Sequence, residues 1–290
     1  MGTTHKKDNQ RYYNPIRKAI LNYKMIEPGE KVAIGLSGGK DSTTLLYLLD
    51  TIKKQQRLGF DFDIHPMVLD MGMDMDLTPL KEFCASLGYK LDIVPTDIAK
   101  IVFDIRQEKN PCSLCANLRR GILYQTAKER GCSKVALGHH LDDAIETFMM
   151  NWLFHGEFRS FEPITYLTRS EVSIIRPMLY VEETAIKHFV QREGLPVIFN
   201  PCPADKKTKR EEMKQLVSRL SVTYPEVRQK FLKGMETGTY ENFWTPKLVE
   251  TSNKKEMITK DEIHEQCNCR YITSEYWRKR DGYFKINHRR

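Results

Sequence analysis

VAIGLSGGKDSTTLLYLL, Val32 to Leu49, runs from an apolar segment through a glycine-rich turn into an apolar stretch with helical spacing. The turn is similar to a P-loop, which has four residues between its first glycine and its Gly-Lys pair, followed by serine or threonine. Here three residues separate Gly35 from Gly39, and Asp41 follows Lys40. The stretch therefore predicts a phosphate-binding turn of another kind, with a carboxylate beside the anion.

We call Ser37–Ser42, SGGKDS, the phosphate loop. Its backbone N–H groups are expected to converge at a helix start, where the helix dipole also favours an anion. Glycine is needed because a side chain would block close approach of the backbone to a phosphate. The residues predicted to bind a nucleotide at this turn are Ser37, Gly38, Gly39, Lys40, Asp41 and Ser42.

Asp41 needs a separate explanation, because a carboxylate repels a phosphate. Its expected role is to hold Mg²⁺ that bridges phosphate oxygens. SGGKDS directly after a strand resembles the PP-loop of the ATP pyrophosphatase family, and the resemblance covers about Lys31 to Leu220. The resemblance implies that ATP is split between its α and β phosphates, which leaves AMP on the substrate.

The 290 residues are 40% hydrophobic and 29% charged, which suits one large α/β domain with appendages or two small domains. The sequence has no apolar run of membrane-spanning length and no signal peptide, so we expect a cytoplasmic protein without a membrane segment. Seven cysteines, an odd number, argue against a disulfide framework. The net charge of +8 favours a polyanionic partner such as nucleic acid.

Short β-rich runs alternate with amphipathic runs, which predicts an α/β fold with a doubly wound, Rossmann-like parallel sheet. Strands are expected at residues 31–37, 62–70, 90–97, 134–140 and 173–179, and residues 195–203 are expected to form a short strand that enters a cysteine loop. Helices are expected at residues 40–54, 78–87, 113–130, 142–154, 181–194 and 206–220. The predicted division is an N-terminal helical and polar segment, 1–30, a PP-loop ATP pyrophosphatase domain, 31–222, and a helical, basic C-terminal extension, 223–290.

In doubly wound sheets, ligands bind beyond the carboxyl ends of the strands. Adenine is therefore expected near Leu69 and Met71, at the end of the second strand. LGHHLDD, at the end of a later strand, brings Asp142 and Asp143 beside the phosphate loop, and by resemblance Gly138 approaches ATP. One of the two carboxylates would complete a Mg²⁺ shell, and N-capping of the next helix by Asp142 is compatible with that role.

NPCSLC places Cys112 and Cys115 at a helix start, where unsatisfied N–H groups and the helix dipole are expected to lower the thiol pKa. Two thiolates at this spacing can hold one metal or form a redox pair. Cys202, in a loop bracketed by prolines, supplies a third thiolate. Cys84 and Cys132 are interpreted as structural. A metal-like composition without a fourth partner is found at His264, Cys267 and Cys269.

Further motifs accompany the phosphate loop: CSLC running into LRRGILY, then ALGHHLDD, then IIRPML, and a late cysteine eight residues before an arginine. Together they resemble the tRNA 2-thiocytidine synthetase family (TtcA), among the iron-sulfur tRNA thiolases; HEQCNC, at His264–Cys269, is not part of that pattern. The resemblance implies a 4Fe-4S cluster held by Cys112, Cys115 and Cys202, with one iron left for the transferred sulfur. It also implies adenylation of the C2 oxygen of a pyrimidine in tRNA, with cytidine 32 favoured.

Arg119 and Arg120 follow Cys115 by about one helical turn, so one of them should face the same cavity and steady the phosphate of an adenylated intermediate. The catalytic residues expected are Asp41, Cys115, Arg119, Asp142 and Cys202. The expected partners are tRNA, a sulfur donor that is either a cysteine desulfurase or inorganic sulfide, and a second copy of the chain, because members of the family are often dimers.

Two basic regions are candidates for contact with tRNA. The first is a basic rim near the third cysteine, formed by Arg176, Lys206, Lys207, Lys209 and Arg210. The second is Arg270–Arg290, which carries seven basic and two acidic residues interleaved with aromatic rings. Cations for phosphates beside rings for bases are typical of proteins that bind single-stranded or looped RNA.

Three other interpretations stay open. A cluster-free thiolase would use Cys115 and Cys202 as a persulfide and disulfide pair. An amide-forming or lysidine-type synthetase would keep its activity without the three cysteines. A non-catalytic iron-sulfur regulator that binds RNA would keep its function without Asp41.

Overall fold

The computed structural model describes residues 7–73, 75–106, 111–198, 202 and 209–238. Met1–Thr239 forms one compact unit. The helices before the sheet and those that follow residue 222, as far as the structure describes them, belong to this unit. The predicted domain boundaries stay a prediction. None of the helices in the described ranges is long and apolar enough to cross a membrane. A cytoplasmic location stays a prediction.

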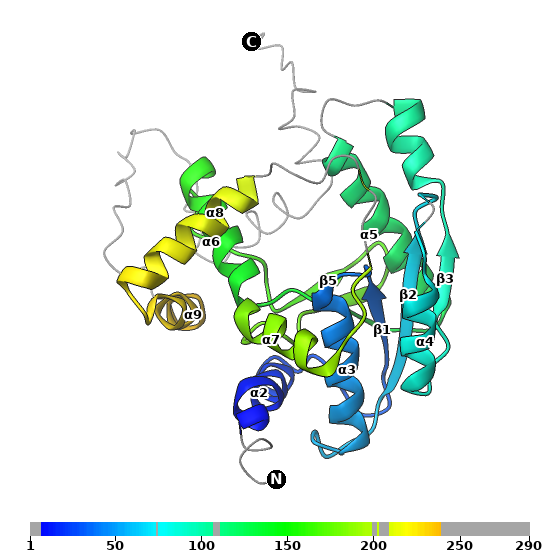
Figure 1. Ribbon diagram of the computed structural model, residues 1–290, viewed down its shortest axis with the longest axis horizontal. Coiled ribbons are helices and arrows are strands. Elements are labelled where there is room, and N and C mark those ends of the chain that lie inside the picture. Colours follow the sequence, from blue (N-terminus) through cyan, green and yellow to red (C-terminus); the bar gives the residue numbers. More distant parts are fainter. Residues whose placement is uncertain (1–6, 74, 107–110, 199–201, 203–208, 239–290) are drawn as a thin grey trace, which may run out of the picture. The chain divides into compact units, whose positions relative to one another are not determined.

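A six-stranded sheet with the order β3-β2-β1-β4-β6-β5 forms the centre of this unit (Figure 1). All neighbouring strands are parallel except the β5–β6 pair, which is antiparallel. The chain moves from β1 in one direction along the sheet and from β4 in the other, so a topological switch point lies between β1 and β4. The predicted doubly wound fold is confirmed. The strands are β1 (Lys31–Leu36), β2 (Asp63–Asp70), β3 (Asp92–Pro95), β4 (Lys134–Ala136), β5 (Ile164–Leu167) and β6 (Val172–Ile175).

Helices cover both faces of the sheet (Figure 1). Val32, Ile34 and Leu36 of β1 face the larger core, which α2, α3, α4 and α7 complete. Ala33 points the other way, toward α5, because successive strand residues alternate between faces. The helical segments are η1 (Asn9–Tyr13), α2 (Asn14–Asn22), α3 (Lys40–Lys54), α4 (Thr78–Ser86), η2 (Lys100–Arg106), α5 (Pro111–Glu129), α6 (Leu141–His155), α7 (Glu183–Glu193), α8 (Lys209–Thr223) and α9 (Val227–Thr237).

The C-terminal helices pack on α6. Leu141, Ile145 and Met149 of α6 form a separate apolar cluster with Met213 and Val217 of α8. Phe231 of α9 packs against the same cluster. This cluster holds α8, which follows Cys202 in the chain, beside the helix that begins at the switch point.

Two expectations about strands were wrong or incomplete. A short strand was expected within residues 195–203, before the cysteine loop, but Leu195–Ile198 has no regular structure. Pro196 lacks an N–H group, and Ile198 N donates to Gly38 O at 2.8 Å instead of to a neighbouring strand. β5 was not predicted; it pairs with β6 through a four-residue turn.

Candidate active site at the switch point

The phosphate loop joins the end of β1 to the start of α3. Gly39 is the N-cap of α3 and provides no side-chain cap, so N–H groups of the first turn remain for an anion. Ser42 Oγ donates to Gly39 O at 3.0 Å, and Ser37 N donates to Ser42 Oγ at 3.1 Å. Gly39 N donates to Ser37 Oγ at 3.3 Å. These bonds fix the shape of the loop before a ligand binds.

Two glycines allow other segments to approach the loop closely. Gly38 has φ of +78°, and a Cβ there would lie 3.2 Å from Cβ of Ile198. At Gly138, a Cβ would lie 3.0 Å from Asp41 C and 3.1 Å from Ser42 N. Gly138 therefore touches the backbone of the phosphate loop, as the resemblance implied for a residue close to the nucleotide.

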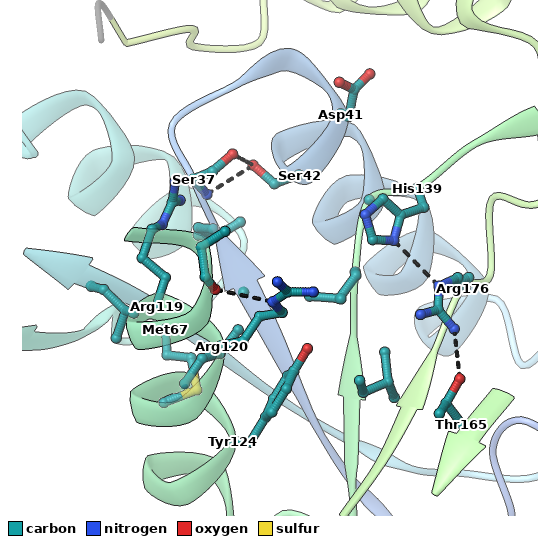
Figure 2. A pocket seen from close by; sticks show the side chains of 18 of the residues that line it. Ser37, Asp41, Ser42, Met67, Arg119, Arg120, Tyr124, His139, Thr165 and Arg176 are labelled. Carbon is teal, nitrogen blue, oxygen red and sulfur yellow. Dashed lines mark hydrogen bonds between the residues drawn. The ribbon is translucent and has the colours of Figure 1, made fainter. Parts of the chain in front are cut away.

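Lys40 and Asp41 form an ion pair at the loop. Lys40 Nζ lies 2.9 Å from Asp41 Oδ1 and 3.1 Å from Glu183 Oε1. Burial by itself would lower the pKa of Lys40, but the two carboxylates outweigh it, so the pKa is raised. Lys40 therefore stays charged near neutral pH. The Asp41 carboxylate points away from Arg119 and Arg120 (Figure 2) and lies 3.7 Å from His140 Nε2.

Only one of the two carboxylates in the GHHLDD segment lies at the crevice, although both were expected there. Asp142 was expected at the crevice, but it is buried and makes structural contacts: Glu183 N donates to Oδ2 and Arg228 Nε to Oδ1, both at 2.7 Å. Asp143 instead lines the crevice. Asp142 is not the N-cap either; His140 caps α6 in a capping box with Asp143. Of the two aspartates, Asp143 is thus the one at the cavity, and the division of roles between them stays a prediction.

A cavity of about 730 Å³, which we call the large cavity, opens at the switch point. Figure 2 shows the phosphate loop on one side, Arg119, Arg120 and Tyr124 of α5 on another, and His139 and Arg176 opposite α5. Its volume is in the usual range for sites that bind small molecules and cofactors. The residues predicted from the sequence for this crevice that line it are Ser37, Asp41, Ser42, Leu69, Arg119, Arg120, Gly138 and Asp143.

Arg176 was expected on a basic rim, but it lies inside this cavity. It is 7% exposed, and its guanidinium donates to His139 Nδ1 at 3.3 Å and to Thr165 Oγ1 at 3.2 Å. Its guanidinium also stacks on Phe161. Burial lowers the pKa of His139 to about 4, so this imidazole is neutral at pH 7 and can accept the bond from Arg176. The docking of β5 explains the difference, because Thr165 of that unpredicted strand encloses the arginine.

A second cavity of about 270 Å³, the small cavity, is lined by Ser37 and Gly39 of the phosphate loop. Cys115 and Cys202 both line it, although they are far apart in the sequence. Arg119 lines both cavities, as expected for a residue one turn after Cys115. The predicted adenine neighbours Leu69 and Met71 line the small cavity as well. The bond from Ile198 N to Gly38 O ties the segment before Cys202 to the phosphate loop.

The three predicted cluster ligands are only partly brought together. Cys112 is exposed, one turn before Cys115 on α5, and is not among the residues that line the small cavity. In the part of the chain that the structure describes, no three His, Cys, Asp or Glu side chains form a group ready to hold a metal ion. Cys112 and Cys202 nevertheless both lie close enough to Cys115 to raise the pKa of its thiol. The three thiols fit an iron-sulfur cluster in residue type, and two of them, Cys115 and Cys202, also fit it in placement.

The thiol pKa differs from the sequence-based expectation. A helix start was expected to lower it, but burial raises the pKa of Cys115, and Arg119 offsets this only in part. Desolvation of the thiolate is therefore the largest influence on the pKa at this position. The two cysteines interpreted as structural are buried, and burial raises the pKa of Cys84 to about 11 and that of Cys132 as well.

The remaining predicted contacts with tRNA are only partly visible. Lys209 pairs with Glu212 and lies over the ring of Phe154, and Arg210 pairs with Asp143 and Glu146. Both belong to the start of α8 and are partly exposed. The other candidates lie outside the described residues: Lys206, Lys207, the stretch Arg270–Arg290, and His264, Cys267 and Cys269.

Comparison with known proteins agrees with this geometry. The family model of the PP-loop domain matches residues 6–220. The tRNA-cytidine(32) 2-sulfurtransferase of Syntrophotalea carbinolica is 36% identical over 221 residues, which are 74% of this chain and 84% of that protein. The chain belongs to the tRNA-cytidine(32) 2-sulfurtransferase family of PP-loop proteins.

Other members of the tRNA-cytidine(32) 2-sulfurtransferase family match to a similar extent. The protein of Coxiella burnetii is 35% identical over 235 residues, 80% of this chain and 91% of that protein. Among solved structures, the U34-tRNA thiolase NcsA from Methanococcus maripaludis with its 4Fe-4S cluster has a TM-score of 0.63. It is 26% identical and covers 77% of this chain and 76% of its own.

One residue of this family member escaped the sequence analysis. Glu183, at the start of α7, lies beside Lys40 although more than a hundred residues separate them. The sequence shows only an acidic first turn of a helix, which is explained well enough by the helix dipole. Thr165, which holds Arg176 together with His139, likewise gave no separate signal.

Proposed function

We propose that the chain is an ATP-dependent tRNA sulfurtransferase that replaces the C2 oxygen of cytidine 32 with sulfur. The observation that carries the proposal is that Cys115 and Cys202 line the same cavity, which residues of the phosphate loop also line. Family membership supports the base and its position. The two relatives are matched over 84% and 91% of their own length, so the comparison concerns the whole catalytic unit.

ATP would bind with its phosphates at the phosphate loop and its adenosine in the adjoining cavities. The open N–H groups at the start of α3 and the ammonium of Lys40 neutralise the phosphates. Leu69 and Met71 offer apolar contact for adenine at the end of β2, and Gly138 leaves room for the nucleotide. Asp41 would hold a Mg²⁺ ion, which would supply charge neutralisation between phosphate oxygens.

The reaction proceeds in two displacements. In the first, the C2 oxygen of the base attacks the α-phosphorus, and the bond to the β-phosphate breaks with release of pyrophosphate. In the second, a sulfide equivalent forms a C–S bond at C2, and the C–O bond breaks with AMP as the leaving group. Arg119, which lines both cavities, is placed between the two sites and stabilises the negative charge of the adenylated intermediate.

Cys112, Cys115 and Cys202 would hold a 4Fe-4S cluster. When bound, such a cluster supplies an iron without a protein ligand that can take up an exogenous sulfur. Cys115 and Cys202 already share the small cavity, and Cys112 lies one helical turn away on α5. The solved thiolase with a 4Fe-4S cluster, which shares the fold at 26% identity, supports this assignment.

The partners of the reaction follow from its chemistry. tRNA supplies the base, and a cysteine desulfurase or inorganic sulfide supplies the sulfur. A homodimer in the cytoplasm is the expected form of the enzyme. The basic rim at Lys209 and Arg210 and the stretch Arg270–Arg290 are the proposed tRNA contacts.

Mass spectrometry of tRNA nucleosides tests the function. Unmodified tRNA is incubated without oxygen with the reconstituted enzyme, ATP, Mg²⁺ and sodium sulfide, and is then digested. We expect 2-thiocytidine, formed only with ATP and mapped to position 32 by fragment analysis. Appearance of 2-thiouridine instead would reassign the base, and absence of any thionucleoside would refute the proposal.

A second mechanism is favoured by one observation, namely that Cys115 and Cys202 line the small cavity and Cys112 does not. In this version the enzyme contains no cluster, and the two lining cysteines act as a persulfide and disulfide pair. A cysteine desulfurase would transfer sulfane sulfur to one cysteine; the outer sulfur of that persulfide would attack C2 and displace AMP, and the second cysteine would then break the S–S bond, leaving a disulfide that an external thiol reduces. The two mechanisms differ in their need for Cys112. Thiolation by Cys112→Ala at the wild-type rate would support the persulfide pair, and loss of thiolation would support the cluster.

A further inference from the structure

Glu183 links the phosphate loop to the helices that follow Cys202. Its carboxylate is buried and contacts three lysines from three helices. Oε1 lies 3.1 Å from Lys40 Nζ of α3 and 2.8 Å from Lys214 Nζ of α8, and Oε2 lies 3.1 Å from Lys187 Nζ of α7. No step of the proposed reaction uses this carboxylate.

The charge of Glu183 is firmly maintained. Burial alone would raise its pKa, but the hydrogen bond from Lys214 and the charge of Lys40 outweigh burial and lower the pKa to about 2. The carboxylate is therefore ionised at every pH at which the enzyme is expected to work. A buried carboxylate with three cations is a fixed electrostatic anchor, since protonation does not release it.

The geometry gives this anchor a specific effect on Lys40. The ammonium groups of Lys40 and Lys214 contact the same carboxylate oxygen, so they are no farther apart than the sum of those two short distances. Without the negative charge between them, they would repel each other in a site that is only partly exposed. Lys40 would still pair with Asp41, but once that carboxylate holds Mg²⁺ the flexible lysine would move away from the phosphate loop toward solvent.

The backbone of Glu183 is fixed by an independent set of contacts. Its N–H donates to Asp142 Oδ2, and Asp142 Oδ1 accepts from Arg228 of α9, both at 2.7 Å. Arg228 also donates to Ser221 of α8 at 2.6 Å. Helices α6, α7, α8 and α9 therefore all contribute to the position of this one carboxylate.

We propose that Glu183 is a positioning residue that holds the Lys40 ammonium at the phosphate loop for contact with the phosphates of ATP. This inference rests on the proposed function in that it takes ATP to bind at this loop. The lysine has three N–H donors, so it can keep its bond to Glu183 and still donate to a phosphate. Through Lys214 and Asp142, the docking of α8 and α9 becomes part of the ATP site.

A double-mutant cycle tests the proposal by equilibrium dialysis of ATP with Mg²⁺, which needs no cluster and no tRNA. Lys40→Gln and Glu183→Gln are each expected to weaken ATP binding about tenfold. If Glu183 acts through Lys40, adding Glu183→Gln to the Lys40→Gln protein changes the affinity less than about twofold. Lys187→Ala removes a contact to the other carboxylate oxygen and is the matched control, with binding within about twofold of wild type.

The outcomes of the double-mutant cycle distinguish a failure of the Glu183 inference from a failure of the proposed ATP site. Wild-type affinity in Glu183→Gln, or an undiminished effect of it in the Lys40→Gln background, overturns the inference. Wild-type affinity in Lys40→Gln itself would refute the ATP site of the proposed function instead. If Glu183→Gln does not fold, Glu183→Asp takes its place, because it keeps the charge on a shorter stem. We then expect an intermediate loss of ATP affinity in the wild-type background and no loss in the Lys40→Gln background. Equal losses in both backgrounds would overturn the inference.

Discussion

At Gly138 the phosphate loop and the end of β4 come into backbone contact. A Cβ at this position would meet Asp41 C at 3.0 Å, and neither backbone can rotate away as a side chain could. The sequence motif indicated this glycine, but its physical reason lies in a contact between segments almost a hundred residues apart. The position of Asp143, and not Asp142, at the cavity also depends on such contacts, because Arg228 and the backbone N–H of Glu183 in α7 both donate hydrogen bonds to Asp142.

Gly138→Ala should displace the phosphate loop. We expect ATP affinity to fall about tenfold or more and the free energy of unfolding to fall by about 1–3 kcal/mol, as for overpacked sites. Equilibrium dialysis and chemical denaturation measure the two effects. Gly121→Ala on α5 is the control, because its Cβ would meet no atom within 4 Å and should stabilise the helix by up to about 1 kcal/mol. Unchanged ATP affinity in Gly138→Ala would show that the loop tolerates the extra atom.

Glu146, on α6 beside Asp143, makes stability depend on pH. Burial, followed by the nearby Asp143 charge, raises the pKa of Glu146 to about 7, above its ordinary value of 4.5. In this range the folded carboxyl keeps a proton that the unfolded one has lost, so its contribution to stability declines as the pH rises from about 4.5 to 7.

Glu146→Gln removes this titration. We expect the variant to be more stable than the wild type by about 1 kcal/mol at pH 8 and equally stable near pH 4.5. Urea denaturation at several pH values gives the comparison. A difference that does not change with pH would show that Glu146 does not titrate in this range.

At the scale of elements, α5 does most to join the two cavities. It carries Cys115 and Arg119 one turn apart, and the close packing of Leu123 against Gly35 holds it over β1. The helix and its two functional residues were predictable, because a run of helical periodicity fixes which residues share a face. The raised pKa of Cys115 was not, since burial by other elements decides it.

Arg119→Ala should slow the adenylation step. A cation that stabilises charge in the transition state contributes about 100-fold to the rate, so we expect pyrophosphate release in the presence of tRNA to fall by that factor. Lys128→Ala, on the same helix and paired with Glu171 at the surface, is the control and should stay within about twofold of wild type. A loss of less than about fivefold in Arg119→Ala would remove this residue from the catalytic set.

The strands show where elements could not be predicted. β5 and β6 are joined by a turn that contains no glycine, proline or asparagine, and Glu171 there has φ of +51°. Such a turn lacks the usual sequence signals of a hairpin. Conversely, one predicted strand does not form. The apolar run after Gly194 was expected to be a strand, but β5 occupies the edge of the sheet and Ile198 binds the phosphate loop.

At the scale of the whole molecule, the sequence was sufficient to predict the doubly wound sheet and the position of its ligand crevice. Alternating periodicities along the chain determine the layers, and the switch-point rule then locates the site. The docking of α8 and α9 on α6 was not predictable, because it depends on one apolar face meeting another. That docking brings Lys214 to Glu183.

The positive charge of the chain should act through its C-terminal stretch. Replacing Arg278, Lys279 and Arg280 together by Gln is expected to weaken tRNA binding at least tenfold and to leave ATP affinity unchanged. The slope of log Kd against log salt should decrease by about two, at roughly 0.7 per cation lost on single-stranded RNA. Replacing Lys254 and Lys255 by Gln serves as the control. An unchanged salt slope in the triple variant would exclude this stretch from the tRNA contact.

The iron and sulfide content of the anaerobically reconstituted protein tests the central claim, that three distant thiols converge beside the phosphate loop. We predict about four iron and four sulfide per chain in the wild type and in Cys84→Ala, and loss of both in Cys112→Ala, Cys115→Ala and Cys202→Ala. Iron retained by Cys202→Ala, or an iron-free wild type that still thiolates tRNA, would contradict the account.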